Sequence, residues 1–221
     1  MLREDDLFSN RTEDYLKNIF KLEQILSPVK TSSIASKMGL SSASVTGMLK
    51  KLQKMKLVIY KPYQGVSLTK KGEKVALEII RHHRLIELFL NQKMGIDWDK
   101  VDIEAEKLEH VLSEELEEVL DKSLGFPTLD PHGDPIPSKE GNIKKMNEKK
   151  LLEVEEGIQV SITRVGQENN EVLKYLGEIG LIPGVSVEIL KKSVKTDTIT
   201  ISINEVSHTF SNSVASLVFV C

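Results

Sequence analysis

Two short stretches of the chain carry side chains that divalent cations bind. His83 and Glu87 stand four residues apart, and Glu106, Glu109 and His110 follow further along the chain. A donor set of carboxylates and imidazoles without a thiolate suits Mn²⁺ or Fe²⁺ better than a structural zinc site. These residue types and spacings predict a divalent-metal site.

Two predicted helices must position these donors. The first is expected from Thr69, its N-cap, to about Lys93, and it places His83 and Glu87 on one face because residues four apart are neighbours on a helix. The second is expected over about residues 100–120, where a rotation of about 100° per residue gathers further donors into one arc. The donors of this arc are Asp102, Glu106, Glu109 and His110, and the apolar seam beside it is Ala105, Leu108, Leu112, Leu116 and Val119.

Carboxylates that border an apolar seam repel and desolvate one another unless a cation joins them. A half-buried histidine beside a solvated acidic helix face would give the same pattern without a metal. The full set of donors on one side of the seam favours the metal site over this alternative.

The segment before these helices is predicted to be a winged helix-turn-helix. Its expected elements are helices at 12–26, at 31–38 and from Ser42 onward, then strands at 57–61 and 66–69 joined by a turn at 62–65. Thr12 is the expected N-cap of the first helix, which counts Ile25 and Leu26 among its apolar positions and stops before Pro28.

The charge of the chain is distributed unevenly. Residues 1–74 carry 14 Lys and Arg against 7 Asp and Glu, residues 75–141 carry 7 against 16, and residues 142–221 carry 9 against 10. A basic first third predicts a polyanion partner and an acidic middle third predicts cations, although two solvated faces of opposite sign would show the same balance.

The exposed face of the third helix and the wing are the predicted DNA contacts. Short hydroxyl side chains can bond bases or phosphates, and lysines can neutralise phosphates. A winged helix used only for protein contacts is the alternative. The predicted DNA-binding residues are Ser41, Ser42, Ser44, Thr46, Lys50, Lys51, Lys54, Lys61 and Tyr63.

The last third of the chain changes character. Four of the seven prolines fall within residues 126–150, which indicates a linker. From residue 152 onward apolar residues recur with period two, except for a short helix expected over about 170–179. This pattern predicts a small, mostly β barrel, so the fold class expected is mainly α with a C-terminal β domain.

The composition of the chain bears on where the protein is expected to act. The N-terminus is charged and lacks the apolar core of a signal peptide, and no apolar run reaches the roughly 18 residues of a membrane span. The single cysteine, Cys221, excludes an internal disulfide. These features lead us to expect a cytoplasmic protein.

Several stretches resemble the diphtheria toxin repressor and manganese transport regulator family of metal-dependent bacterial repressors. Over the first two thirds these stretches are Thr12-Glu-Asp-Tyr-Leu16, Ser44-Val-Thr46, His83-Arg-Leu-Ile-Glu87, Glu109-His-Val-Leu-Ser113 and Asp130-Pro-His-Gly-Asp-Pro-Ile-Pro137. Residues 152–221, with Leu176-Gly-Glu-Ile-Gly-Leu-Ile-Pro-Gly184, resemble the SH3-like domain of the longer members.

The resemblance implies two metal positions. In the first, Asp14 joins Glu106, Glu109 and His110, and the pair Asp14 and Glu106 is the one that manganese sensors carry. In the second, His83 and Glu87 are joined by Asp102. The resemblance further implies a ligand at Asp130 and places contributions from the SH3-like domain near Gln167 and Glu168. Two departures are Lys17, where short manganese regulators have a glutamate, and Gly47, where iron sensors have a longer polar side chain.

The resulting hypothesis is a homodimeric transcriptional repressor of metal-uptake genes, activated by Mn²⁺ or Fe²⁺ and bound to palindromic operator DNA. Its expected parts are a winged helix-turn-helix domain at 1–74, a helical metal-binding and dimerisation domain at 75–141, a linker at 142–151 and an SH3-like domain at 152–221. A carboxylate–histidine metalloenzyme is the rival, but the stretch Glu106-x-x-Glu109-His110 lacks the Glu-x-x-His spacing of di-iron bundles, and the chain has no His-Glu-x-x-His zinc motif. A winged-helix adaptor that needs neither DNA nor metal is a third possibility.

Overall fold

A computed structural model describes residues 9–167 and 169–221. The chain folds into two compact units, and each is described by itself. The first unit comprises the chain up to His82 together with Pro137–Asn142, and the second comprises His83–Ile136 together with Ile143–Cys221. Within the described residues, none of the helices combines the length and the hydropathy needed to cross a bilayer.

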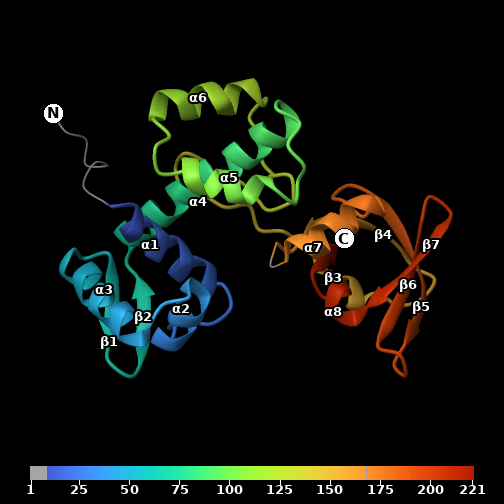
Figure 1. The fold of residues 1–221 in the computed structure, drawn as a ribbon, viewed down its shortest axis with the longest axis horizontal. Coiled ribbons are helices and arrows are strands. Elements are labelled where there is room, and N and C mark those ends of the chain that lie inside the picture. The colour runs from blue at the N-terminus through green and yellow to red at the C-terminus, as the bar shows by residue number, and fades with distance from the viewer. Residues whose placement is uncertain (1–8, 168) are drawn as a thin grey trace. The chain divides into compact units, whose positions relative to one another are not determined.

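The first unit contains the predicted winged helix-turn-helix (Figure 1). Its elements are α1 (Asn10–Glu23), α2 (Thr31–Met38), α3 (Ser42–Lys54), β1 (Val58–Lys61), β2 (Gly65–Leu68) and the first part of α4 (Lys70–Gln92). The apolar stripe of α3 packs inward as predicted, with Val45, Leu49 and Leu52 fully buried. The two strands pair as an antiparallel hairpin, which forms the wing.

Both ends of α1 differ from the prediction. The helix begins after Ser9, so Thr12 lies inside it, and it ends at Glu23. Ile25 and Leu26 follow the helix and are 82 % and 62 % exposed. After the helix the Leu22 carbonyl accepts from the N–H groups of both Ile25 and Leu26. The residue before Pro28 is disfavoured in the helical conformation, so the helix does not continue through it.

The helix α4 begins as predicted. The Thr69 side-chain oxygen accepts a hydrogen bond from the Gly72 N–H at 3.1 Å, which is the geometry of an N-cap. The helix continues to Gln92 and carries the His83–Glu87 pair into the second unit.

The second predicted helix of the middle region is two helices, so the expectation of one helix over residues 100–120 is wrong. The structure has α5 (Val101–Leu108) and α6 (Glu114–Ser123). The Ser113 side chain accepts a hydrogen bond from the Leu116 N–H and starts α6 as a new helix. Of the expected seam, Ala105 is fully buried, whereas Leu116 and Val119 are 48 % and 57 % exposed.

The proline-rich stretch contains an ordered loop, which we call the Asp130 loop (residues 129–135). Leu129 and Pro135 form a β-bridge, and the Asp130 Oδ1 accepts hydrogen bonds from the N–H groups of His132 and Asp134 at 2.8 and 2.9 Å. Next to the loop, Ile136 packs on α4 in a small apolar cluster. The first part of the stretch interpreted as a linker is therefore fixed by its own side chains.

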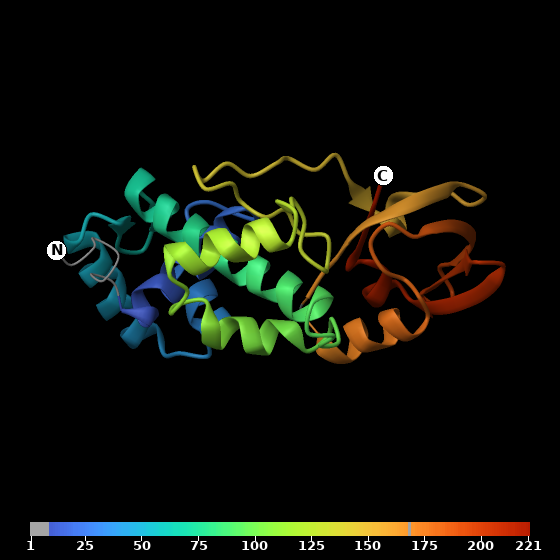
Figure 2. The same ribbon diagram turned by 90° about the horizontal axis from the view of Figure 1, so that it is seen from above.

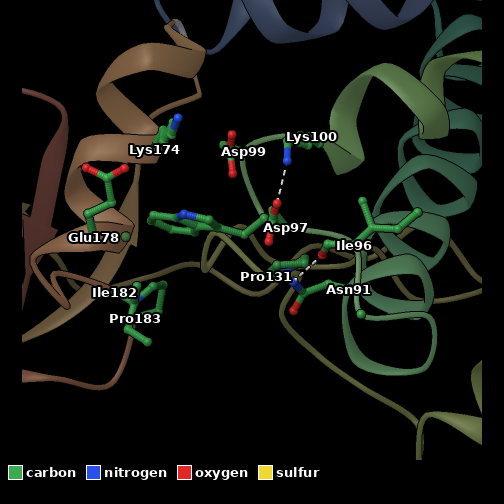
Figure 3. Close-up of a pocket in the computed structure, with 13 residues that line it drawn as sticks. Asn91, Ile96, Asp97, Asp99, Lys100, Pro131, Lys174, Glu178, Ile182 and Pro183 are labelled. Carbon is green, nitrogen blue, oxygen red and sulfur yellow. Dashed lines mark hydrogen bonds and ion pairs between the residues drawn. The ribbon is translucent and has the colours of Figure 1, made fainter.

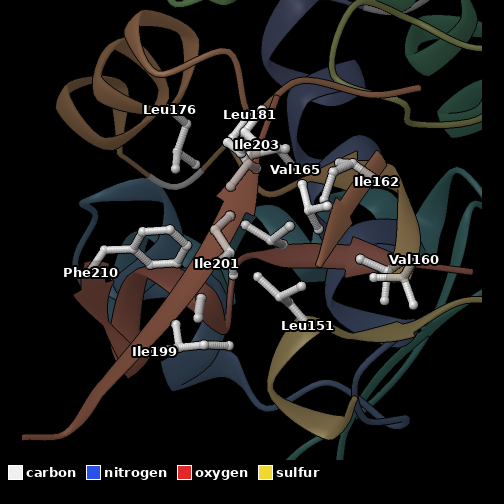
Figure 4. Packing of buried hydrophobic residues seen from close by; sticks show 14 of the residues in the cluster. Leu151, Val160, Ile162, Val165, Leu176, Leu181, Ile199, Ile201, Ile203 and Phe210 are labelled. Atoms are coloured by element: carbon white, nitrogen blue, oxygen red, sulfur yellow. The ribbon is translucent and has the colours of Figure 1, made fainter. Parts of the chain in front are cut away.

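The C-terminal sheet region (residues 149–221) is antiparallel, with the strand order β3-β8-β4-β5-β6-β7. Its elements are β3 (Lys149–Lys150), a 3₁₀ turn (Leu151–Glu153), β4 (Gln159–Val165), α7 (Asn170–Glu178), β5 (Ser186–Ser193), β6 (Thr198–Ile203), β7 (Val206–Ser211), α8 (Asn212–Ala215) and β8 (Val218–Val220). Alternate residues such as Ile199, Ile201 and Ile203 enter one core (Figure 4). The predicted period-two pattern and the helix near 170–179 are confirmed, whereas Val154 follows the 3₁₀ turn and lies outside the strands.

Candidate metal centre

His83 lies at the centre of a group of carboxylates in the second unit. It is contributed by α4 and is almost fully buried. Its Nε2 lies 3.5 Å from Glu87 Oε1 and 3.2 Å from Asp102 Oδ1. Its Nδ1 lies 2.5 Å from Glu109 Oε2 and 3.9 Å from Glu106 Oε2. Glu87 of α4 and three acids from α5 and its C-terminal end thus surround the His83 imidazole.

The electrostatics of this group favour an additional positive charge. Burial by itself lowers the pKa of the His83 imidazole, but the carboxylates of Glu87, Asp102 and Glu109 raise that pKa well above its usual value. One proton on His83 supplies a single positive charge against several carboxylates. A divalent cation supplies two, and two overlapping sets of donors are close enough for one: His83, Glu87 and Asp102, and His83, Glu106 and Glu109.

A second group of donors is fully buried. One ligand atom each from Glu87, Asp130 and His132 lies within 4.8 Å of the others. Burial, followed by the charges of Glu87 and Asp134, raises the pKa of the Asp130 carboxyl group well above its usual range, although Arg84 nearby acts in the opposite direction. Arg84 lies 3.6 Å from Asp130 Oδ2, so a purely structural ion pair accounts for part of this arrangement.

The hydrogen bonds of the second group leave its metal-binding atoms unsatisfied. Within the described residues, neither oxygen of Glu87, nor Asp130 Oδ2, nor His132 Nδ1 has a hydrogen-bond partner. His132 Nε2 lies 2.8 Å from the carbonyl oxygen of Trp98, which can only accept, so Nε2 carries the proton and Nδ1 presents a lone pair. Unsatisfied buried acceptors cost about 1–3 kcal/mol each. A divalent cation fits this donor set because it would satisfy all of them together.

The structure places most of the predicted ligands in this cluster. Glu109 is fully buried and the His110 side chain is nearly so, with its Nε2 3.4 Å from Glu109 Oε1. Asp102 and Glu106 are about half exposed. Asp14 is a half-buried residue of α1 in the first unit, and its part in a metal site stays a prediction.

The sequence analysis missed one candidate donor, and its expectation of ligands from the sheet region stays a prediction. His132 was not predicted as a ligand, although the Asp130-Pro-His-Gly stretch, with an imidazole between a proline and a glycine, was the signal that could have identified it. The Gln167 side chain donates to Asp134 Oδ2 at 3.2 Å, and its part in a metal site stays a prediction. Glu168 lies outside the described residues.

The predicted DNA-binding residues lie on the surface of the first unit. Ser41 caps α3 by accepting from the Ser44 N–H, and Thr46 donates its hydroxyl hydrogen to the Ser42 carbonyl at 2.8 Å. The Ser41 hydroxyl also donates to Ser44 Oγ at 3.0 Å, so the Thr46 hydroxyl, whose hydrogen is already donated, offers its lone pairs to a partner. Of the nine predicted DNA-binding residues only Thr46 is partly buried, and the exposed ones are Ser41, Ser42, Ser44, Lys50, Lys51, Lys54, Lys61 and Tyr63.

A basic winged helix joined to helices that gather buried carboxylates and imidazoles defines the class of metal-responsive winged-helix regulators. Family models match three parts of the chain in order. The N-terminal DNA binding domain of the iron dependent repressors matches residues 7–66, and their metal binding and dimerisation domain matches residues 69–138. The FeoA domain matches residues 149–221. This chain belongs to the iron-dependent repressor family, that of the diphtheria toxin repressor, as the resemblance of its motifs indicated.

Individual relatives agree with this assignment. The iron-dependent repressor IdeR of Mycobacterium tuberculosis strain H37Rv is 30 % identical over 191 residues, covering 80 % of this chain and 83 % of IdeR. The transcriptional regulator MntR of Bacillus subtilis is 37 % identical over 101 residues, covering 46 % of this chain and 70 % of MntR. A solved manganese-dependent transcriptional repressor in complex with manganese superposes with a TM-score of 0.86 at 30 % identity, covering 95 % of this chain and 99 % of that one.

Proposed function

We propose that this protein is a transcriptional repressor that binds operator DNA as a homodimer when it is loaded with Mn²⁺ or Fe²⁺. The observation that carries the proposal is the buried group of Glu87, Asp130 and His132, whose ligand atoms lack hydrogen-bond partners. A regulator that senses a cation needs a site of this kind. The relatives named for iron and for manganese dependence support both candidate metals.

We assign the metal ligands to two positions. The first consists of Asp14, Glu106, Glu109 and His110, and the second of His83, Glu87, Asp102, Asp130 and His132. When bound, the cation supplies positive charge that offsets the mutual repulsion of these carboxylates. We infer that Asp14 links α1 of the DNA-binding domain to the helices that hold the other ligands of the first position. Such a link would fix the separation of the two α3 helices of a dimer, which must enter successive major grooves.

Exposed apolar side chains support a dimer through the middle region. They come from α5, α6 and the segments that follow each helix, and they are Ile103, Leu108, Val111, Leu116, Val119 and Phe126. Several large exposed apolar side chains within a short stretch of chain favour a protein interface in this region. The matching family model describes the same residues as a dimerisation domain.

The domain borders, the target genes and the location of the protein are also proposed. We place the domain borders at 1–74, 75–141 and 152–221 with a linker at 142–151, and the targets are proposed to be genes of metal uptake with palindromic operators. The protein is proposed to act in the cytoplasm, as a regulator of operator DNA without an enzymatic activity. A turnover assay with the metal-loaded protein tests the enzymatic alternative.

Operator binding under metal titration tests the proposal. Fluorescence anisotropy of labelled operator DNA is followed while Mn²⁺, Fe²⁺ or Zn²⁺ is added to the metal-free protein. We expect saturable activation by Mn²⁺ or Fe²⁺, reduced by both Glu106→Ala and His83→Ala, and unaffected by Glu188→Gln on an exposed part of β5. Binding to random DNA that does not weaken as salt is raised would instead indicate the adaptor alternative.

A further inference from the structure

Trp98, the one tryptophan of the chain, contacts the Asp130 loop. Its ring stacks on the His132 imidazole, with the ring centroids 5.4 Å apart and the planes inclined by 22°. Its carbonyl oxygen lies 2.8 Å from His132 Nε2. Trp98 therefore fixes both the orientation of His132 and the tautomer that leaves Nδ1 free to bind a cation.

The other side of Trp98 contacts the C-terminal sheet region. Its side chain packs against the core of that region, and it meets α7 at Gly177. A Cβ atom at Gly177 would lie 2.5 Å from Trp98 Nε1 and 3.2 Å from Cε2. Glycine inside a helix costs about 0.5–1 kcal/mol relative to alanine. The close approach of the indole is a reason for a glycine at this position.

The Asp130 loop meets the sheet region a second time, along β4. A Cβ atom at Gly133 would lie 2.0 Å from the carbonyl oxygen of Thr163. The Val165 N–H donates to the His132 carbonyl at 2.9 Å, and Asp134 accepts from the Gln167 side chain. The loop that carries two proposed ligands is thus held on the sheet region by backbone contact as well as by Trp98.

The junction between α7 and the segment before α5 is otherwise open. A pocket of about 650 Å³ lies there, lined by residues of both parts (Figure 3). In Figure 3, Lys174 and Glu178 of α7 lie across this pocket from Asp97 and Asn91, and Figure 2 shows the orange α7 beside the green segment that leads into α5. Because a pocket separates much of α7 from the segment before α5, Trp98 and Gly177 supply a close contact here in addition to those along β4.

We propose that the C-terminal sheet region acts as an intramolecular clamp on the Asp130 loop, with Trp98 and Gly177 as positioning residues for the cation held by Glu87, Asp130 and His132. The region supplies none of these three ligands, but their affinity for the cation depends on its docking. The proposal rests on the metal site proposed above. Residues that orient a metal ligand contribute about 10–100-fold to metal affinity.

The test uses Gly177→Ala and the larger Gly177→Leu, with Glu171→Ala on the exposed first turn of α7 as the matched control. Mn²⁺ binding to each full-length protein is measured by electron paramagnetic resonance of free Mn²⁺ and by calorimetry. We expect one class of sites to weaken at least about tenfold in both Gly177 variants, the remaining sites to keep their affinity, and the control to match the wild type. Global unfolding would weaken every class of sites together.

A double variant separates a steric cause from a general loss of structure. Trp98→Phe removes the indole nitrogen that a Cβ at position 177 would meet, so Trp98→Phe with Gly177→Ala should bind Mn²⁺ more tightly than Gly177→Ala alone. Wild-type affinity in both Gly177 variants would overturn the clamp. If the His132→Ala variant bound Mn²⁺ as tightly as the wild type, this would overturn the proposed metal site itself, and the clamp with it.

Discussion

Replacement of Glu87 by glutamine should have opposite effects on the metal-free and the metal-loaded protein. The Glu87 side chain is 0 % exposed, and neither oxygen accepts a hydrogen bond within the described part of the chain. A glutamine of the same shape removes a buried negative charge beside Asp130, and its amide group can donate to Asp130 Oδ2, which also lacks a hydrogen-bond partner.

The magnitude follows from these contacts. A buried polar atom without a partner costs about 1–3 kcal/mol, so satisfying one or more of them should raise the free energy of unfolding of the metal-free variant by about that amount. The variant gives up the 3.5 Å ion pair with His83, but that imidazole keeps the carboxylates of Asp102, Glu106 and Glu109. The expected net change in chelator is therefore stabilisation.

With added metal, the wild type should become the more stable of the two proteins. A ligand present at about 100 times its dissociation constant stabilises the folded state by about 2.7 kcal/mol. Wild-type protein should gain this stability from Mn²⁺, and Glu87→Gln should gain much less because it lacks a charged ligand. Urea denaturation in chelator and in Mn²⁺ gives both values, provided that the slope of the transition is unchanged.

The exposed Glu188→Gln variant is the control, and it should follow the wild type under both conditions. A Glu87→Gln protein that is less stable than wild type in chelator, and that gains equal stability from Mn²⁺, would refute this reasoning. Glu87 would then be a structural carboxylate paired with His83 and not a metal ligand.

Four further outcomes are expected. Lys50→Ala and Lys51→Ala should each weaken binding to all DNA sequences and lower the slope of log affinity against log salt by about 1, as measured by anisotropy. Leu116→Glu should shift the dimer to monomer in analytical ultracentrifugation, because it places a charge on the proposed apolar interface. Ser113→Ala should lower the free energy of unfolding by about 0.5–2 kcal/mol in urea, because α6 loses its N-cap. Gly47→Ala should raise the melting temperature, because α3 is helical there and a Cβ atom would meet nothing within 4 Å.

Periodicity identified the residues that regular helices position. His83 and Glu87 converge because they are one turn apart on α4, and the acids of α5 reach them from a helix whose apolar face was visible in the sequence. The buried stripe of α3 was predicted for the same reason. Where local spacing determines the arrangement, the sequence was sufficient.

Positions that depend on tertiary contacts were not predicted. His132 is a candidate ligand only because the Asp130 loop packs beside α4, and Trp98 sets its tautomer from far away in the sequence. The break between α5 and α6, where Ser113 caps the new helix, lies within an apolar pattern that is also compatible with one continuous helix. The strand β7 is mostly polar, with Phe210 as its one buried residue, because it lies at the edge of the sheet, and so it lacks the alternation that reveals the other strands.

The central claim is that a bound cation and operator DNA stabilise one another's binding. The most direct measurement is the dissociation constant of the wild-type protein for operator DNA, determined once in chelator and once in saturating Mn²⁺ or Fe²⁺ at the same salt concentration. We predict that the metal tightens binding by about 5–150-fold, the range of a typical allosteric coupling, and that His132→Ala reduces this ratio. Equal dissociation constants with and without metal would contradict the account.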